Sequence, residues 1–287
     1  MNRKITTAAA TAALTAGMAT AANADEIRIG WTAWADAEFI TRMAEDVITS
    51  EFDTDVELVQ TDIAPQYTGL AEGDIDLMLM SWQPITHEDY IEEFGDEIED
   101  LGVLYDDAKL GWIVPASLYE QGLTSIEDLQ DPEWQDRLDG QIQGIDPGAG
   151  LTRLSHDVID EYDLDYDLIE ASDAAMTAAL DRAARRDDAI VVTGWSPHWK
   201  FGAYLLEYLD DPKGVLGDAE HINAMSRQGF RDDHPEVAAF ASCIEIDIDL
   251  LNEYMFLGRE IGTEEAVDEF LEDEADLVAS WVECARN

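Results

Sequence analysis

The chain has 287 residues, of which 65 are Asp or Glu and 16 are Lys or Arg, and its formal net charge at pH 7 is −49. A surface this negative repels nucleic-acid phosphates and anionic lipid headgroups, so the composition argues against a nucleic-acid-binding protein and against one that docks on lipid. With 46% hydrophobic and 9% aromatic residues the chain is too apolar to be disordered, and its length fits one large domain or two lobes.

The acidic residues are spread along the whole chain instead of being gathered in one tail. Self-repulsion of this size destabilises a compact fold in dilute buffer, and salt screens it. The composition therefore predicts a surface suited to concentrated salt.

Residues 1–24 have the three parts of a secretory signal peptide. Arg3 and Lys4 form a basic start, a stretch rich in Ala, Thr and Leu follows, and residues 22–24 (Ala-Asn-Ala) form a small-x-small cleavage site. No cysteine follows that site for lipid attachment, and no later stretch reaches the ~20 apolar residues of a spanning helix. The sequence therefore predicts a mature protein that begins near Asp25 and works in the periplasm without a lipid anchor.

The chain has two cysteines, which is too few for a disulfide-stapled scaffold. In an oxidising compartment Cys243 and Cys284 could form one disulfide, and two free buried thiols are the alternative. No C-x-x-C or Cys/His cluster suggests zinc, and no acidic run continues into a calcium-binding loop. Neither a metal nor another cofactor is expected.

Segments with strand-like and helix-like patterns alternate from the start of the mature chain. The range 38–52, for example, carries its apolar residues at helical spacing, and residues 124–129 look like a capped helix start. Strands are predicted, in chain order, at residues 26–31, 56–59, 76–80 and 110–114. The alternation indicates an α/β protein with largely parallel strands.

The same alternation continues in the second half of the chain. Strands are predicted at residues 141–145 and 189–193, and helices at 151–162, 173–185, 234–246 and 264–281. Two α/β lobes joined by two crossings, near 114–118 and 205–212, account for this order. One lobe then takes residues 25–115 plus 208–287, and the other takes residues 116–207.

Three of the eight tryptophans follow predicted strands, where α/β folds place ligands. These are Trp34, Trp82 and Trp195; Trp31, at the end of the first strand, could take the place of Trp34. Indole faces attract a cation that cannot donate hydrogen bonds, and quaternary ammonium is the usual ligand of such a pocket. Sugars also stack on tryptophan, and simple packing of these rings is a third possibility.

A glycine-rich turn at residues 144–151 links a predicted strand to a predicted helix. Unpaired backbone N–H groups and the positive end of the helix dipole make such a turn an anion site, although an ordinary tight turn is the alternative. The turn lacks the Gly-Lys-Ser/Thr ending of a nucleotide phosphate loop, so a single carboxylate fits it better than a triphosphate. His87, five residues after Trp82, could supply a further donor.

Three motifs in this order carry a resemblance to a known family. They are Trp-x-Pro-x-Thr-His at residues 82–87, Gly-Ile-Asp-Pro-Gly-Ala-Gly at 144–150 and Gly-Trp-Ser-Pro-His-Trp-Lys-Phe at 194–201. Together with the segment 211–222, they resemble the glycine betaine/proline betaine-binding proteins of ABC import systems. The resemblance covers nearly the whole mature chain. It implies a two-lobed periplasmic-binding-protein fold, type II-like, that closes by a hinge around one small zwitterion in the cleft between the lobes.

The resemblance also assigns roles to the residues singled out above. By the family's pattern, Trp34, Trp82 and Trp195 match the aromatic cage around the trimethylammonium head of the ligand. The backbone amides of Gly150 and Leu151, together with the His87 side chain, match the grip on the ligand carboxylate. The extreme acidity departs from typical members of the family and points to a salt-loving bacterium.

The sequence therefore predicts a secreted solute-binding protein that captures glycine betaine, and also proline betaine, for the membrane permease of an ABC importer. We expect it to be a monomer and not an enzyme. Choline, carnitine or ectoine is an alternative ligand, although choline has no carboxylate to fill the anion site. A secreted hydrolase is a distant alternative, since Ser155-His156 and Ser196-Pro197-His198 place serine near histidine without a Gly-x-Ser-x-Gly elbow.

Overall fold

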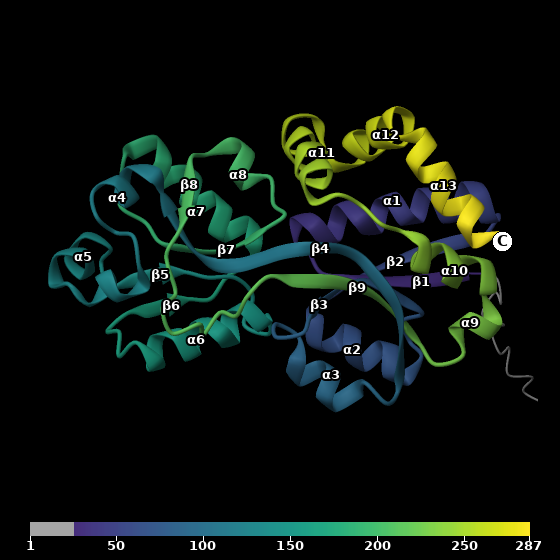
Figure 1. Ribbon diagram of the computed structural model, residues 1–287, viewed down its shortest axis with the longest axis horizontal. Coiled ribbons are helices and arrows are strands. Elements are labelled where there is room, and N and C mark those ends of the chain that lie inside the picture. Colours follow the sequence, from purple (N-terminus) through teal and green to yellow (C-terminus); the bar gives the residue numbers. More distant parts are fainter. Residues whose placement is uncertain (1–25) are drawn as a thin grey trace, which may run out of the picture.

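The computed structural model describes residues 26–287, and the predicted signal peptide at residues 1–24 lies outside them. The described chain forms two lobes that follow one another along the longest axis of the molecule (Figure 1). We call the lobe that holds both the first strand and the C-terminus the terminal lobe, and the other one the central lobe. The chain passes from the terminal lobe into the central lobe and back, so both ends of the sequence build the terminal lobe.

Five strands form the sheet of the terminal lobe. Their order is β2 (Asp55–Gln60), β1 (Glu26–Trp31), β3 (Leu77–Gln83), β9 (Glu220–Arg227) and β4 (Ile98–Pro115). β1 is parallel to β2 and β3, whereas β9 is antiparallel to β3 and β4. The expectation of largely parallel strands therefore holds for four strands of this sheet, and it fails for β9, which was not predicted and runs against the other four. Six of the eight residues of β9 are buried, so it lacks the alternation by which a half-buried strand is recognised.

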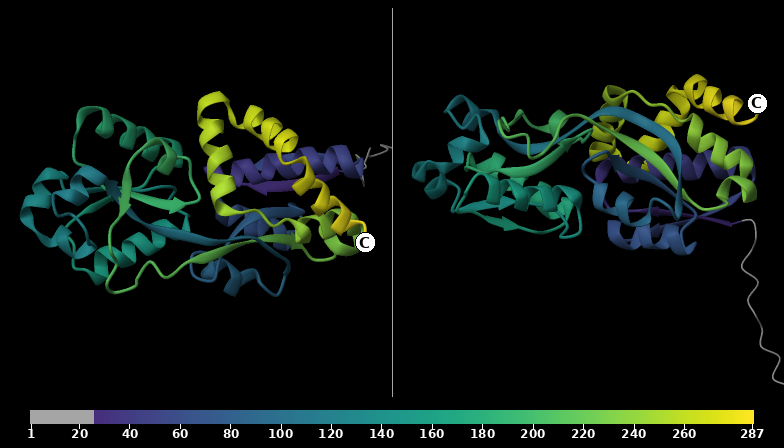
Figure 2. Two further views of the ribbon diagram at one scale, coloured as in Figure 1. Left: turned by 45° about the horizontal axis from the view of Figure 1, so that its top comes forward. Right: turned by 60° about the horizontal axis from the view of Figure 1, so that its bottom comes forward.

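β4 belongs to both lobes. Its residues 98–108 pair with β9 in the terminal lobe, and its residues 109–115 pair with β7 (Val192–Ser196) and β8 (Leu206–Tyr208) in the central lobe. Figures 1 and 2 show this long strand running from one lobe into the other. The predicted strand at 110–114 is only its last third, because acidic residues and pairing irregularities interrupt the apolar pattern of the first part. The lobe boundaries expected from the sequence, 25–115 plus 208–287 and 116–207, remain a prediction.

The helices of the terminal lobe lie against the two faces of its sheet. They are α1 (Ala35–Phe52), α2 (Ile63–Glu72), α3 (Glu88–Phe94), α9 (Phe230–Asp233), α10 (Pro235–Cys243), α11 (Ile248–Ile261), α12 (Thr263–Asp273) and α13 (Ala275–Ala285). The predicted helix at 264–281 is in fact α12 and α13, which meet at Glu274, and the break allows α13 to pack against α10. α11 was not predicted.

In the central lobe, β5 (Gln141–Gln143) is parallel to both β7 and β6 (Asp167–Ile169). The helices of this lobe are α4 (Ala116–Glu120), η1 (Ile126–Gln130), α5 (Pro132–Arg137), α6 (Gly150–Glu161), α7 (Asp173–Arg186) and α8 (Lys200–Ala203). The helix start predicted at residue 124 proves to be the short 3-10 helix η1. A cap is present, as predicted, and the Ser125 side chain forms it. The helix nevertheless ends after five residues, because Asp131 is extended and caps the next helix, which begins at Pro132.

A single apolar core runs through both lobes. Among the helices of residues 26–287, not one combines the length and the apolar character that crossing a bilayer requires.

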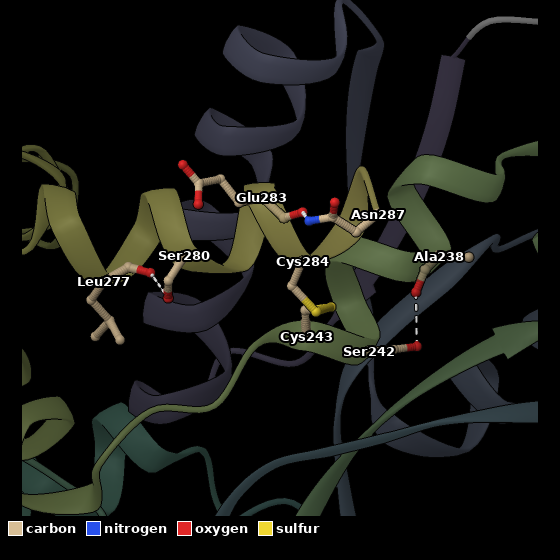
Figure 3. Close-up of a disulfide and its surroundings, with 8 residues drawn as sticks. All are labelled: Ala238, Ser242, Cys243, Leu277, Ser280, Glu283, Cys284 and Asn287. Atoms are coloured by element: carbon tan, nitrogen blue, oxygen red, sulfur yellow. Dashed lines mark hydrogen bonds between the residues drawn. A yellow bond between two sulfur atoms is a disulfide. The ribbon is translucent and has the colours of Figure 1, made fainter.

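The two cysteines form one disulfide in the terminal lobe. Cys243 at the end of α10 is joined to Cys284 in α13 (Figure 3). The alternative of two free thiols is therefore wrong for this structure. The bond ties the last helix of the chain to the helix that lies beneath it.

Candidate functional site

Ten residues from both lobes surround one cavity. The terminal lobe contributes Trp34, Trp82, Thr86 and His87, β4 contributes Leu110, and the central lobe contributes Ile145, Ala149, Gly150, Leu151 and Trp195. The cavity holds about 270 Å³ of space free of protein atoms, open solvent at its mouth included. All six residues predicted from the sequence as ligand contacts are among the ten. Thr86, Leu110, Ile145 and Ala149 were not predicted.

Three indoles form the aromatic part of the cavity wall. Trp34 precedes the first turn of α1, Trp82 lies near the end of β3, and Trp195 lies in β7. The rings of Trp34 and Trp195 meet edge to face, with centroids 6.4 Å apart and an interplanar angle of 61°. All three side chains are buried, so the faces that line the cavity are shielded from bulk water.

Trp31, the alternative to Trp34, does not line this cavity. Its ring is buried, and the guanidinium carbon of Arg42 lies 5.6 Å from the ring centroid. The two tryptophans of this segment therefore lie in different places: Trp31 packs in the core, and Trp34 lines the cavity.

Carboxylates from the opposite lobe fix the orientation of two of these indoles. Trp34 Nε1 donates a hydrogen bond to Asp146 Oδ2 at 2.9 Å, and Trp195 Nε1 donates one to Asp36 Oδ1 at 2.9 Å. Asp36 Oδ2 also accepts a hydrogen bond from the Tyr105 hydroxyl at 2.8 Å. Burial raises the pKa of Asp36, and these two hydrogen bonds oppose the shift. Two of the three indoles are thus oriented by hydrogen bonds that cross from one lobe to the other.

Neither carboxylate was predicted from the sequence. Asp36 lies two residues after Trp34, and Asp146 lies inside the glycine-rich motif. In a chain with 65 acidic residues, neither position stands out without the fold that brings it to an indole N–H.

His87 presents a hydrogen-bond donor to the cavity. The backbone N–H of Trp82 donates to His87 Nδ1 at 3.1 Å, so the proton of the neutral ring is on Nε2. Burial, together with the positive charge of Arg153, lowers the pKa of His87 to about 3, which keeps the ring neutral near pH 7. His87 Nε2 is buried and has no protein partner among the described residues. Its N–H is therefore available to a ligand in the cavity.

The first turn of α6 supplies two more donors. Gly150 and Leu151 are the first two residues of this helix, so their N–H groups have no acceptor inside the helix. The first turn carries no acidic residue, and the positive end of the helix dipole faces the cavity that both residues line. Three donors from two lobes can therefore reach one anionic group.

The serine and histidine residues that suggested a hydrolase are not assembled as a catalytic pair. Ser155 is buried and accepts a hydrogen bond from Trp112 Nε1 at 3.0 Å, whereas the neighbouring His156 is exposed and lies 2.8 Å from Glu170. Both ring nitrogens of His198 already have partners in the protein.

Comparison with known proteins gives the same picture of the chain. Residues 25–273 match a family described as the substrate-binding domain of ABC-type glycine betaine transport systems, named OpuAC. Over 152 residues the chain is 36% identical to the glycine betaine/carnitine transport binding protein GbuC of Listeria monocytogenes, a match that covers 52% of this chain and 51% of GbuC. The chain spans about half the length of the glycine betaine-binding relatives that it matches.

Two solved structures agree with the whole fold. Lactococcal OpuAC in its closed-liganded conformation with glycine betaine has a TM-score of 0.82 and 31% identity, over 90% of this chain and 99% of the other. An ABC-transporter choline binding protein in complex with choline has a TM-score of 0.82 and 25% identity, over 91% of this chain and 92% of the other. The predicted fold class, a two-lobed α/β periplasmic-binding-protein fold, is confirmed. Since both the family match and the fold extend over most of its length, this chain belongs to the substrate-binding domains of ABC-type glycine betaine transport systems.

Proposed function

We propose that this chain is an extracytoplasmic solute-binding protein that captures glycine betaine, and also proline betaine, and delivers it to the membrane permease of an ABC importer. One observation carries the proposal: a single cavity holds a wall of three indoles and three backbone or side-chain N–H donors without acceptors of their own. A betaine has one group for each, a quaternary ammonium head and a carboxylate. The similar lactococcal structure was solved with glycine betaine.

The indoles of Trp34, Trp82 and Trp195 form the cage for the cation. A quaternary ammonium offers no hydrogen-bond donor, so it gains little from polar side chains and most from the negative faces of aromatic rings. Each desolvated cation–π contact is worth about 2 kcal/mol. The burial of the three side chains provides that desolvation.

The N–H groups of Gly150 and Leu151 and His87 Nε2–H hold the carboxylate. The neutral state of His87 matters here, because its single free N–H is a donor whereas Nδ1 is occupied by the backbone N–H of Trp82. Hydrogen bonds to a charged acceptor contribute about 1.5–3 kcal/mol each, which is more than neutral pairs do.

Binding and lobe closure are the whole mechanism. The cage needs Trp34 and Trp82 from one lobe and Trp195 from the other, so the ligand and the cross-lobe hydrogen bonds to Asp36 and Asp146 stabilise the same closed arrangement.

No bond of the ligand is made or broken, so the protein is not an enzyme and uses no cofactor. It acts as a monomer in the periplasm, and its lobes are residues 25–115 plus 208–287 and residues 116–207.

Calorimetric titration with glycine betaine in concentrated NaCl tests the proposal. We expect saturable binding that Trp34→Leu weakens at least about tenfold, because leucine keeps apolar volume but has no aromatic face. Trp31→Leu is the matched control in the same segment, and its affinity should stay within about twofold of the wild type. A folded wild-type protein that does not bind glycine betaine would contradict the proposed function.

Choline, carnitine and ectoine are the competing ligands. A choline-binding protein shares this fold at 25% identity, so the fold itself does not decide between them. The three free donors favour a ligand with a carboxylate, because choline offers them one neutral hydroxyl oxygen in place of two charged carboxylate oxygens. Stronger binding of choline than of glycine betaine would contradict the assignment of Gly150, Leu151 and His87 to a carboxylate.

A further inference from the structure

A buried lysine lies against the cage. The Nζ atom of Lys200, the first residue of α8, is 3.9 Å from the ring centroid of Trp195. The Lys200 side chain is fully buried, and Nζ has no hydrogen-bond partner among the described residues. Trp195 lines the ligand cavity and Lys200 does not. Lys200 therefore contacts a residue of the cage without lining the cavity itself.

Two carboxylates, one from each lobe, lie near this ammonium. Asp36 on α1 accepts the indole N–H of Trp195, and Asp173 at the start of α7 lies 3.2 Å from His198 Nε2. Both carboxylates act on Lys200 by charge, and neither forms an ion pair with it.

A positive charge on Trp195 changes what the cage prefers. It draws the π electrons of the indole toward itself, and it repels a second cation across a dry region where charges are poorly screened. A ligand with a net positive charge experiences the whole repulsion. In a zwitterion the carboxylate is attracted by the same ammonium, which offsets part of the repulsion of its cationic head.

We propose that Lys200 is a specificity-determining residue: its ammonium, held against Trp195, penalises net-cationic ligands such as choline more than zwitterionic betaines. The inference rests on the proposed function, because it concerns the ligand preference of the same cage. It assigns to Lys200 an effect on the ratio of two affinities, which a role in packing alone does not produce.

The charge state of Lys200 supplies an independent signature. Burial lowers the pKa of Lys200 to about 7, and the charges of Asp173 and Asp36 oppose the shift. Raising the pH through neutrality therefore removes the ammonium and reduces the penalty on choline. The other titratable groups that face this cluster are Asp36, whose pKa burial raises, Asp173, His198, with a pKa of about 4, and Tyr105, whose pKa is far above its usual value. Comparison with a variant that lacks Lys200 separates its effect from theirs.

The test measures the dissociation constants of glycine betaine and of choline, at about pH 6 and about pH 9, for the wild type, Lys200→Met and Lys213→Met. Methionine keeps the length of the chain without the charge. Lys213 is the matched control, since its Nζ also lies over an aromatic ring, 4.5 Å from the centroid of Tyr162, but the residue is exposed and does not line the cavity.

We expect Lys200→Met at the lower pH to bring the affinity for choline about tenfold closer to the affinity for glycine betaine. At the higher pH the wild type and Lys200→Met should have nearly the same ratio, and Lys213→Met should match the wild type at both. Equal weakening of both ligands, or an unchanged ratio, would overturn the inference.

The wild type provides a test that needs no substitution. If Lys200→Met does not fold, a ratio of the two affinities that stays constant in the wild type from about pH 6 to about pH 9 overturns the inference. A folded wild type that binds neither ligand overturns the proposed function and this inference with it, whereas betaine binding with an unchanged ratio overturns this inference alone.

Discussion

The α-carbon of Gly150 in the central lobe faces the backbone carbonyl of Thr86 in the terminal lobe so closely that a methyl group on Gly150 would overlap the carbonyl oxygen. The clashing atom belongs to the backbone, so no side-chain rotation relieves it. A residue with a side chain at position 150 would therefore prevent the two lobes from coming this close. Gly150 is also the first residue of α6.

The first prediction follows from this contact. Gly150→Ala keeps the lobes apart, so we expect a folded protein whose affinity for glycine betaine falls at least about a hundredfold, as measured by calorimetry. Gly148→Ala is the matched control, because a methyl group there would come no closer than 3.9 Å to its nearest neighbour, Tyr90 Oη. Wild-type affinity of Gly150→Ala would show that the lobes bind the ligand without this approach.

The second prediction concerns the carboxylate that orients Trp34. Asp146→Ala leaves the indole N–H of Trp34 buried without its acceptor, which costs about 1–3 kcal/mol in the closed state. Binding of glycine betaine should weaken about tenfold to a hundredfold in a calorimetric titration. Asp188→Ala removes the same charge from an exposed position in the central lobe and should leave the affinity unchanged.

The third prediction uses the buried, neutral state of His87. Its pKa is about 3 in the folded protein against 6.5 for an unperturbed side chain, so the unfolded state takes up a proton first as the pH falls. This contribution to stability is complete above about pH 6.5 and is lost progressively toward pH 3. When the pH falls from about 7 to about 5, the unfolding free energy of the wild type should therefore decrease by about 2 kcal/mol more than that of His87→Gln.

Urea denaturation at a series of pH values measures that difference. Parallel pH profiles for the wild type and His87→Gln would mean that His87 takes up its proton at the same pH in the folded and the unfolded state, which contradicts a buried, neutral ring.

The fold could be predicted where the apolar pattern of an element is visible within that element alone. α1 shows its buried face in Phe39, Ile40 and Met43, and the predicted range misses its start by three residues. β9 and the first part of β4 were missed because neither has a clear period of two: β9 is buried on both faces of the sheet, and β4 changes partners between the two lobes. Those partners come from distant parts of the chain, so a local window does not contain them.

The candidate site divides in the same way. The three tryptophans, His87 and the start of α6 could be recognised by residue type and by their place after a predicted strand, and all of them line the cavity. The roles of Asp36 and Lys200 were missed, although Lys200 lies inside the motif at 194–201, since no local pattern distinguishes either residue from the others of its type. Their roles arise from burial against Trp195, which the folded structure alone provides.

The fourth prediction is that the disulfide stabilises the fold without affecting the ligand. Cys243 and Cys284 are 41 residues apart, and a cross-link of this span restricts the unfolded chain enough to contribute about 4 kcal/mol. Cys243→Ser with Cys284→Ser should lower the unfolding free energy by about that amount in urea titrations. The affinity for glycine betaine should remain that of the wild type, because neither cysteine lines the cavity. An unchanged urea midpoint would contradict the stabilising role.

The last prediction concerns salt. Carboxylates face one another between elements as well as along them: burial raises the pKa of Asp46 on α1, and the charge of Asp268 on α12 raises it further. Ionic strength shortens the screening length from about 10 Å at 0.1 M to about 3 Å at 1 M, so added salt relieves this repulsion in the folded state. The thermal midpoint should rise by at least about 5 °C between about 0.1 M and about 2 M NaCl.

A single substitution separates screening from a general effect of salt on hydrophobic burial. Asp268→Asn removes one member of the repelling pair, so its midpoint should exceed that of the wild type in dilute buffer and approach it in concentrated NaCl. Glu245→Gln, an exposed residue outside α1 and α12, removes one charge elsewhere and serves as the control. A constant gap between Asp268→Asn and the wild type at all salt concentrations would show that the carboxylate acts through a local contact and not through its charge.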